Sequence, residues 1–561
     1  MVRKILAFIF KGFALWRKVN NHFSLMEILR IRIIFSIVCS SMIFACIIYR
    51  IADLMIIGNK DSATKPIIPN ESPVKRADIV DRNGILLATN IMTYSCFADP
   101  SAVLDINETV QKLSNIPEMP TRTKLNKKLI DKNKHFIWLA RHITPEIQEK
   151  IMDLGLPGIA LKKDYKRIYI HGPLFSHVIG CTDTDGNGVC GLEKKFDKSL
   201  VVYNDKKLIL SLDLRLQSII YEELQKGIEK FNAIGGNAIF MSINGEVLTM
   251  VSLPDFDGNN IVDAKTLFNR NTLAVFEPGS TFKILNVAIA LDSRSATLGS
   301  MFDASNPIKF GRHMISDFKG KGRALSLAEA FVFSSNIASV KIAQNFGMDV
   351  QKAYLKRFGI MDKVSFEIPE IGAPIIPTYW TESTSMTVAY GYGIALSPLQ
   401  ILSTITSIVN DGRKVYPTLL YGNTKGPGEQ IVSSETSAIV RDLMRAVILY
   451  GTGKKAGIDE VEIFGKTGTA YKSSKKGYGS DGSRTRITTF IGGFPKDSPK
   501  YMLILMLDEP KAVEGTFGYA TAGWNVAPIA QNIFKRITPL LSNGEEKHET
   551  KLSSIKYINL N

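Results

Sequence analysis

One stretch constrains the fold of this chain more than any other, a short polar turn that runs directly into a long apolar segment. The turn EPGSTFK occupies residues 277–283, and the apolar segment that follows, 284–291, is interrupted by a single asparagine. A proline and a glycine mark the entry, and a run this apolar is typical of a helix that its domain covers on most sides. The pattern predicts a buried helix with Ser280 at or near its N-terminus and Lys283 one turn further along the same face.

This spacing suits nucleophilic catalysis. A serine hydroxyl is a weak nucleophile unless a base takes its proton, and a lysine serves as that base when burial or a second cation keeps its amine neutral. However, S-x-x-K is a short pattern, and it also occurs at 72–75 in a proline-containing stretch and at 473–476 in a loop rich in glycine and lysine. Neither of those copies precedes an apolar helix. For the turn alone, an ordinary helix start remains an open alternative.

Two further motifs follow in the chain. Ser334-Ser335-Asn336 is an S-x-N flanked by apolar residues, and Lys466-Thr467-Gly468 is a K-T-G that follows a short apolar strand. Each motif alone is weak, the first being typical of a polar turn between helices. S-x-N begins 51 residues after Lys283, and K-T-G begins 130 residues after Asn336. The three motifs in this order are the signature of penicillin-binding proteins and class A β-lactamases.

On these motifs the chain resembles a class B penicillin-binding protein, from about Arg76 to Pro528. The resemblance implies an α+β, multidomain fold with a single transmembrane helix, an elongated α+β N-terminal module and a transpeptidase domain. That domain would hold an antiparallel sheet flanked by helices, as in serine β-lactamases. The predicted boundaries are 1–32 for a basic cytoplasmic segment, 33–57 for the transmembrane helix, 58–75 for a linker, 76–206 for the N-terminal module, 207–542 for the transpeptidase domain and 543–561 for a tail.

The resemblance also implies catalytic roles. Ser280 would attack the carbonyl between the last two D-alanines of a peptidoglycan stem peptide, with Lys283 as general base. Ser334 would pass a proton to the leaving amine, Asn336 would orient Lys283 and the substrate amide, and Lys466 would keep Lys283 neutral while attracting the substrate carboxylate. The amine of a second stem peptide would then resolve the ester into a cross-link.

Substrate binding is implied for the K-T-G strand. Thr467 and Thr469 would offer hydroxyls to the substrate carboxylate, and Gly468 would let the substrate approach the backbone. The backbone N–H groups of Ser280 and Thr469 would form the oxyanion hole.

Composition excludes several other classes of protein. The chain has 561 residues, of which 45% are hydrophobic and 22% charged, so it suits two or three domains with sizeable cores and is neither disordered nor polytopic. Its formal charge of +16 is spread along the chain without a recognised nucleic-acid module, which favours an anionic membrane surface or an acidic polymer over nucleic acid.

We expect no metal and no cofactor. Residues 183–188, DTDGNG, begin like a calcium loop, but Lys194 stands where a bidentate glutamate is due, which favours a plain turn.

The segment 33–49 has 17 residues without a charge, enough for a helix of roughly 26 Å. Seven basic residues and the single acid Glu27 precede it. The positive-inside rule therefore predicts a single-pass protein with a cytoplasmic N-terminus and the rest of the chain outside. In a bacterium, as the resemblance implies, this places the span in the inner membrane and the catalytic domain in the periplasm.

Several shorter patterns predict local structure. A turn at 81–84 should lead into a strand, 237–253 should form two strands joined at Asn244-Gly245, and a closing helix is expected at 525–537. Cys181 and Cys190 bracket a glycine-rich turn and could pair in an oxidising compartment, but the sequence leaves that pairing open.

The resemblance to the septal, FtsI type is stronger than that to the elongation type, on 156–159, 166–169 and 188–193 together with the length and the lack of a large insertion. It implies a cell-division enzyme that β-lactams inhibit and that works with a membrane glycan polymerase and divisome proteins. The open alternatives are an elongation-type transpeptidase, a D,D-carboxypeptidase or β-lactamase that uses water as acceptor, and a β-lactam-binding sensor.

Overall fold

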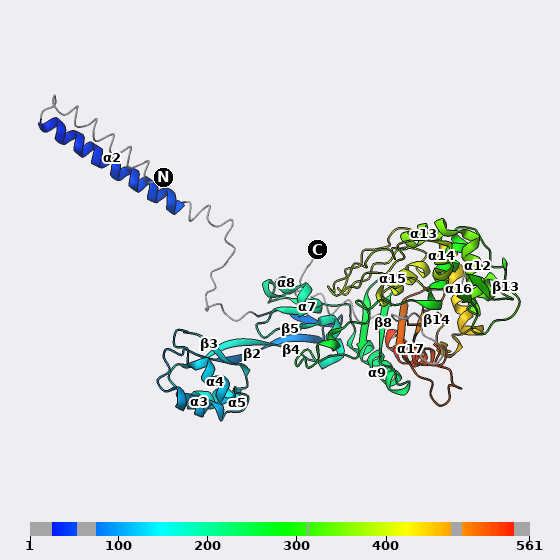
Figure 1. Cartoon of the computed structure of the whole chain (residues 1–561), viewed down its shortest axis with the longest axis horizontal. Coiled ribbons are helices and arrows are strands. Elements are labelled where there is room, and N and C mark those ends of the chain that lie inside the picture. The colour runs from blue at the N-terminus through cyan, green and yellow to red at the C-terminus, as the bar shows by residue number, and fades with distance from the viewer. Residues whose placement is uncertain (1–24, 53–74, 311–312, 473–484, 543–561) are drawn as a thin grey trace. The chain divides into compact units, whose positions relative to one another are not determined.

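The computed structural model describes residues 25–52, 75–310, 313–472 and 485–542. Several predicted segments lie wholly or partly outside the described residues, namely 1–24 of the basic segment, 53–57 of the transmembrane helix, 58–74 of the linker and the tail 543–561. The chain separates into two compact units, Met1–Ser72 and Pro73–Asn561. Each unit is described by itself (Figure 1).

The first unit contains α2, a helix of 28 residues at Leu25–Ala52. Within it, the 18 residues Ile33–Arg50 are long enough and apolar enough to cross a membrane, and none of them is buried. The helix begins eight residues before the predicted apolar run, because Leu, Met, Glu and Arg in 25–32 are all good helix formers. A backbone that forms its hydrogen bonds internally, as a helix does, is what a membrane requires.

The second unit opens with a five-stranded sheet in which β2 is the central strand. β2 pairs antiparallel with β1, β3 and β4, and its ladder with β4 runs from Ala88 opposite Tyr169 to Ala98 opposite Ile159. β7 pairs in parallel with β1 and completes this sheet just past the predicted boundary at residue 206. The strands are β1 Asp78–Val80, β2 Leu86–Ala98, β3 Ile137–Ile143, β4 Ile159–Tyr169 and β7 Lys207–Ile209.

Small helices cover one end of this sheet. Their apolar faces form a separate core with β2 and β3, in which Leu113, Leu125 and Leu129 are fully buried. The turn predicted at 81–84 is present, and the DTDGNG segment also forms a turn, in which Asp183 accepts the backbone N–H groups of Asp185 and Asn187. The elements of this region are α3 Ile106–Ser114, α4 Arg122–Leu129, α5 Pro145–Asp153, η2 Gly172–Phe175, α6 Ser176–Ile179, β5 Cys181–Thr182, β6 Gly188–Cys190, α7 Gly191–Lys195 and α8 Asp197–Val202.

A second five-stranded sheet, entirely antiparallel, forms the centre of the C-terminal part. Its strand order is β14-β15-β16-β8-β9, so that β14 lies at one edge. The predicted hairpin is confirmed, and Gly245 takes a positive φ of 101° in its turn. The strands are β8 Gly235–Ser242, β9 Val247–Leu253, β14 Phe464–Tyr471, β15 Arg486–Phe494 and β16 Tyr501–Asp508.

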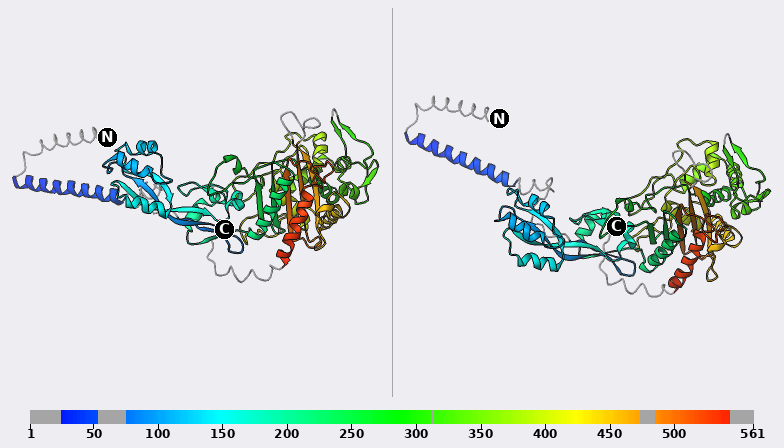
Figure 2. Two further views of the ribbon diagram at one scale, coloured as in Figure 1. Left: turned by 90° about the horizontal axis from the view of Figure 1, so that it is seen from below. Right: turned by 60° about the horizontal axis from the view of Figure 1, so that its bottom comes forward.

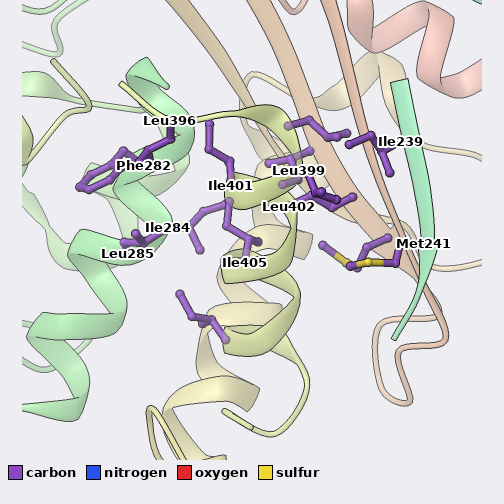
Figure 3. Packing of buried hydrophobic residues seen from close by; sticks show 14 of the residues in the cluster. Ile239, Met241, Phe282, Ile284, Leu285, Leu396, Leu399, Ile401, Leu402 and Ile405 are labelled. Carbon is purple, nitrogen blue, oxygen red and sulfur yellow. The ribbon is translucent and has the colours of Figure 1, made fainter. Parts of the chain in front are cut away.

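Helices cover both faces of this sheet (Figures 1 and 2). On one face α9, Leu214–Lys230, and α17, Val526–Ser542, pack over a core that includes Phe240, Phe490 and Phe534. On the other face α10, Lys283–Asp292, and α15, Pro398–Val409, pack together, as Figure 3 shows for Ile284, Leu285, Leu402 and Ile405 beside Ile239 and Met241 of β8.

The hydrophobic core on the α10 and α15 side of this sheet continues into the N-terminal sheet, since Ile79 and Leu87 belong to it. The two regions of this unit are therefore joined by packing as well as by the chain. The remaining elements are η3 Ala264–Leu267, η4 Gly279–Phe282, β10 Met301–Asp303, β11 Ile308–Phe310, β12 His313–Ile315, β13 Ala324–Ser326, α11 Leu327–Val332, α12 Asn336–Phe346, α13 Met348–Arg357, α14 Glu382–Val388, α16 Ser434–Tyr450 and η5 Lys454–Ala456.

Candidate active site

The predicted serine lies where the sequence places it, at the start of a buried helix. Ser280 sits half-buried in η4, a single 3-10 turn that continues directly into α10. The turn that contains Gly391 and Gly393 holds the serine turn in place. Gly279 donates its N–H to Gly391 O at 3.0 Å, and Gly393 donates its N–H to Glu277 Oε1 at 2.7 Å. Gly391 has a φ of 86°, and a Cβ there would come within 2.1 Å of Gly279 O. Only glycine allows the two turns to pack this closely.

Lys283 is the first residue of α10 and is 1% exposed. Its Nζ donates to Ser334 O at 2.7 Å, to Asn336 Oδ1 at 2.7 Å and to Ser334 Oγ at 3.3 Å. Burial lowers the pKa of Lys283 well below its usual value, and the charge of Lys466 lowers it further, whereas Asp317 acts to raise it. The direct contact of Lys283 with the Ser280 hydroxyl, expected from the helical spacing, stays a prediction.

The S-x-N motif joins α11 to α12, as its flanking sequences predict. Ser334 takes a left-handed conformation with φ 60°, which turns the chain sharply, and Asn336 begins α12. Sequence reasoning missed the residue that supports this turn. Asp317 accepts hydrogen bonds from Ser335 Oγ at 2.7 Å, Asn336 N at 2.5 Å and Ile337 N at 3.1 Å. It stands about twenty residues upstream in an irregular segment, where no local pattern indicated a role.

The K-T-G motif lies inside β14, not after a strand as the sequence suggested. Lys466 is fully buried, and its Nζ donates to Ser334 Oγ at 3.0 Å and to Thr467 O at 3.0 Å. Burial lowers the pKa of Lys466 to about 7. Gly468 faces the serine turn, since a Cβ there would lie 2.9 Å from the Thr281 methyl group. The glycine thus allows the strand to pack against η4.

The two threonines of the motif are also fixed by hydrogen bonds. Thr467 Oγ1 lies 2.5 Å from Thr452 Oγ1, and Thr469 Oγ1 accepts the N–H of Ala522 at 3.1 Å. Thr452 and Ala522 are further site residues that the sequence did not reveal. They come from the turn after α16 and from the segment before α17, neither of which carries a motif.

These residues line one cleft of about 430 Å³. Ser280, the S-x-N residues and Thr467 to Thr469 reach its surface, while Lys283 and Lys466 lie buried behind it. The Ser334 hydroxyl lies within hydrogen-bond distance of both lysines, so a proton can pass between the amines through one oxygen. The cleft therefore combines a serine hydroxyl, a buried amine of lowered pKa and a second hydroxyl between two amines, groups that acyl transfer can use. No group of three or more His, Cys, Asp or Glu residues that could hold a metal occurs in the described ranges.

Comparison with known families agrees with this geometry. Residues 236–535 match the penicillin binding protein transpeptidase domain, and residues 71–209 match the penicillin-binding protein dimerisation domain. The chain belongs to the class B penicillin-binding proteins.

Curated relatives match most of the chain. It is 33% identical to the "Probable peptidoglycan D,D-transpeptidase FtsI" of Caulobacter vibrioides, over 86% of this chain and 83% of that one. It is 31% identical to the "Probable peptidoglycan D,D-transpeptidase PenA" of Neisseria gonorrhoeae, over 88% and 90%, and 28% identical to the Escherichia coli K12 peptidoglycan D,D-transpeptidase FtsI, over 85% and 87%. Among solved structures, a peptidoglycan synthetase from Bifidobacterium adolescentis has the same fold, with a TM-score of 0.66, 19% identity and coverage of 84% and 96%.

Proposed function

We propose that the protein is a peptidoglycan D,D-transpeptidase of the septal type that cross-links stem peptides through an acyl-enzyme on Ser280. The single observation that carries the mechanism is the Ser334 hydroxyl, which lies between the amines of Lys283 and Lys466 beside the serine turn. The family assignment and the FtsI and PenA relatives support the reaction and its substrate.

Acylation begins when Lys283 takes the proton of Ser280. Both lysines are buried and neither donates to a carboxylate, so the fold disfavours two ammonium groups at this site. A neutral Lys283 amine donates two hydrogen bonds, to Ser334 O and Asn336 Oδ1, and keeps a lone pair for the Ser280 proton. Two neutral acceptors beside Lys283 therefore suit a lysine that acts as the general base.

Ser280 Oγ then attacks the carbonyl carbon between the last two D-alanines. The developing oxyanion is held by the backbone N–H groups of Ser280 and Thr469. The packing of β14 on η4 supports this role, since both residues line the cleft. The C–N bond breaks, Ser334 passes the proton to the leaving amine, and D-alanine departs. The Thr467 and Thr469 hydroxyls bind the carboxylate of that departing residue, and the charge of Lys466 behind them attracts it.

The ester on Ser280 is then attacked by the amine of a second stem peptide. This restores the serine hydroxyl and forms the cross-link. A β-lactam enters the same pathway, because its strained amide takes the place of the D-alanyl-D-alanine bond and leaves an ester on Ser280.

The membrane helix and the N-terminal module support a role in an assembly. α2 provides a single-pass membrane anchor, and we propose that it places the N-terminus in the cytoplasm and the catalytic domain in the periplasm. The FtsI names among the relatives support work at the septum with a membrane glycan polymerase and divisome proteins.

The test of the mechanism is covalent labelling. Fluorescent penicillin should label the wild-type protein and leave Ser280→Ala unlabelled, on a denaturing gel with equal folded protein loaded. Labelling of the alanine variant would show that another residue is the nucleophile. The septal role is tested by depletion in the native bacterium, where filamentation with mid-cell localisation is expected, and rounded cells with dispersed signal would favour elongation.

A further inference from the structure

Four lysines at the mouth of the catalytic cleft take no part in the reaction described above. Lys319 and Lys321 belong to the segment between β12 and β13, and Lys454 and Lys455 belong to η5. All four are exposed, and all four line the same cleft as Ser280. We call this set the lysine rim.

Aromatic rings of the cleft wall hold three of these ammonium groups in place. Lys455 Nζ lies 3.4 Å from the centre of the Trp524 ring, Lys319 Nζ lies 4.5 Å from that of Tyr519, and Lys321 Nζ lies 4.4 Å from that of Phe333. Tyr519 and Trp524 themselves stack, with an angle of 16° between their planes. A ring attracts an ammonium group but accepts no full hydrogen bond from it, so the N–H donors stay available to an anion.

The described lining of the cleft holds too little negative charge to balance the rim. Asp317 is the one carboxylate among the residues that line it, and its oxygens already accept from Ser335, Asn336 and Ile337. None of the four lysines forms an ion pair with another described residue. Unbalanced charge of one sign in a concave site raises the local concentration of ligands of the opposite sign.

We propose that the lysine rim is a specificity subsite for an acidic donor peptide. It would bind carboxylates that the peptide carries upstream of the scissile bond, in addition to the terminal carboxylate held by the K-T-G strand. The inference rests on the proposed function, which makes the occupant of this cleft a peptide. Two pairs of lysines on separate segments favour a ligand with two or more carboxylates along its length.

The experiment compares two soluble peptides that end in D-alanyl-D-alanine, one with free upstream carboxylates and one with those groups amidated. The measured quantity is the ratio of their kcat/KM values for D-alanine release, in the whole protein. The wild-type protein should prefer the acidic peptide, and the preference should weaken with added salt. Each lysine should contribute about two- to five-fold to the ratio, as expected for exposed charge pairs.

The variants are Lys319→Gln with Lys321→Gln, Lys454→Gln with Lys455→Gln, and all four together, which should bring the ratio close to one. The matched control is Lys352→Gln with Lys356→Gln, two exposed lysines on α13 that lie outside the cleft lining. It removes the same charge and should keep the wild-type ratio. Thermal unfolding and penicillin labelling of each variant check that it is folded.

Two results would overturn the rim as a subsite while leaving the transpeptidase proposal intact. One is equal kcat/KM values for the two peptides in the wild-type protein. The other is a four-lysine variant that prefers the acidic peptide as strongly as the wild-type protein does. Equal losses of preference in the control and rim variants would also overturn it, since net charge would then be the cause. Failure of the proposed function has a different signature, namely no D-alanine release from either peptide or labelling of Ser280→Ala.

Discussion

Arg76 in the N-terminal module and Lys283 in the candidate active site are each 1% exposed, but of the two only Arg76 forms direct ion pairs with carboxylates of the described residues. Arg76 contacts Glu193 at 2.8 Å and Asp197 at 2.7 Å, and Arg167 contacts the other oxygen of Glu193 at 2.7 Å. Burial acts to lower the pKa of Arg76, but its two carboxylate partners outweigh burial, and the pKa is raised.

The two lysines of the active site, in contrast, donate no hydrogen bond to a carboxylate among the described residues. Lys283 and Lys466 share the Ser334 hydroxyl and donate otherwise to neutral carbonyl oxygens, so burial lowers the pKa of both. Buried charged groups therefore have two uses in this molecule. Paired charges join distant segments, whereas an amine without a carboxylate partner suits the base that we propose. Substitutions should therefore separate stability from activity.

The largest effect is expected from Lys283→Met. Loss of the general base should lower the rate of penicillin acylation by about 10²- to 10⁴-fold. The free energy of unfolding should stay the same or rise, because an apolar side chain replaces a buried amine without a carboxylate partner. Stopped-flow acylation and denaturant unfolding measure the two quantities, with Lys352→Met as the control. A wild-type acylation rate would place the base elsewhere.

Glu193→Gln should lower the stability of the protein and leave its acylation rate unchanged. It leaves Arg76 and Arg167 buried without the carboxylate that both contact, and breaking such a pair costs about 3–5 kcal/mol of unfolding free energy. Denaturant unfolding followed by circular dichroism measures this loss, with the exposed Glu149→Gln as its control. Acylation of the protein that remains folded should keep its wild-type rate. If Glu193→Gln proved as stable as Glu149→Gln, the cluster would not join the segments as we infer.

A smaller effect is expected from the cysteine pair near that cluster. Cys181 and Cys190 lie opposite each other in β5 and β6, with both thiols free and their Sγ atoms 3.0 Å apart. Oxidised glutathione should convert the two thiols into a disulfide, releasing two reduced glutathiones, and closing so short a loop should add about 2–3 kcal/mol to the unfolding free energy.

Mass spectrometry of the alkylated protein checks the bond, and unfolding with and without reductant checks its effect. Burial raises the pKa of Cys96 to about 12, so Cys96 should stay a thiol and serve as the internal control. If Cys181→Ser with Cys190→Ser were as stable as the oxidised wild type, the hairpin would rely on its hydrogen bonds alone.

The smallest effect concerns the pH profile of acylation. The rate should rise with pH while the amine that acts as base loses its proton, and it should fall above about pH 7, where Lys466 becomes neutral and no longer attracts the substrate carboxylate. Lys466→Arg keeps its charge at all these pH values, so the falling limb should disappear. Its rate near neutral pH should drop about ten-fold or less, because the planar guanidinium fits the Ser334 contact poorly. An unchanged falling limb would assign that limb to another group.

Much of the fold followed from local patterns. The apolar run after Lys283 became α10, and the Asn244-Gly245 turn joined two strands where expected, because helix periodicity and turn chemistry act over a few residues. The parallel pairing of β1 with β7 could not be predicted in this way. Its partners are separated by more than a hundred residues, and nothing in three-residue strands specifies which distant strand they join.

The candidate catalytic residues could be proposed from the sequence alone, since Ser280, Lys283, the S-x-N and the K-T-G are short motifs that are recognised by their order along the chain. The surroundings of these residues became visible in the folded protein. It placed Lys466 and Lys283 on one Ser334 hydroxyl and set Asp317 under the S-x-N turn. The physical reason is that a pKa depends on burial and on nearby charges, and both come from segments that are distant in the sequence and meet only in the folded core.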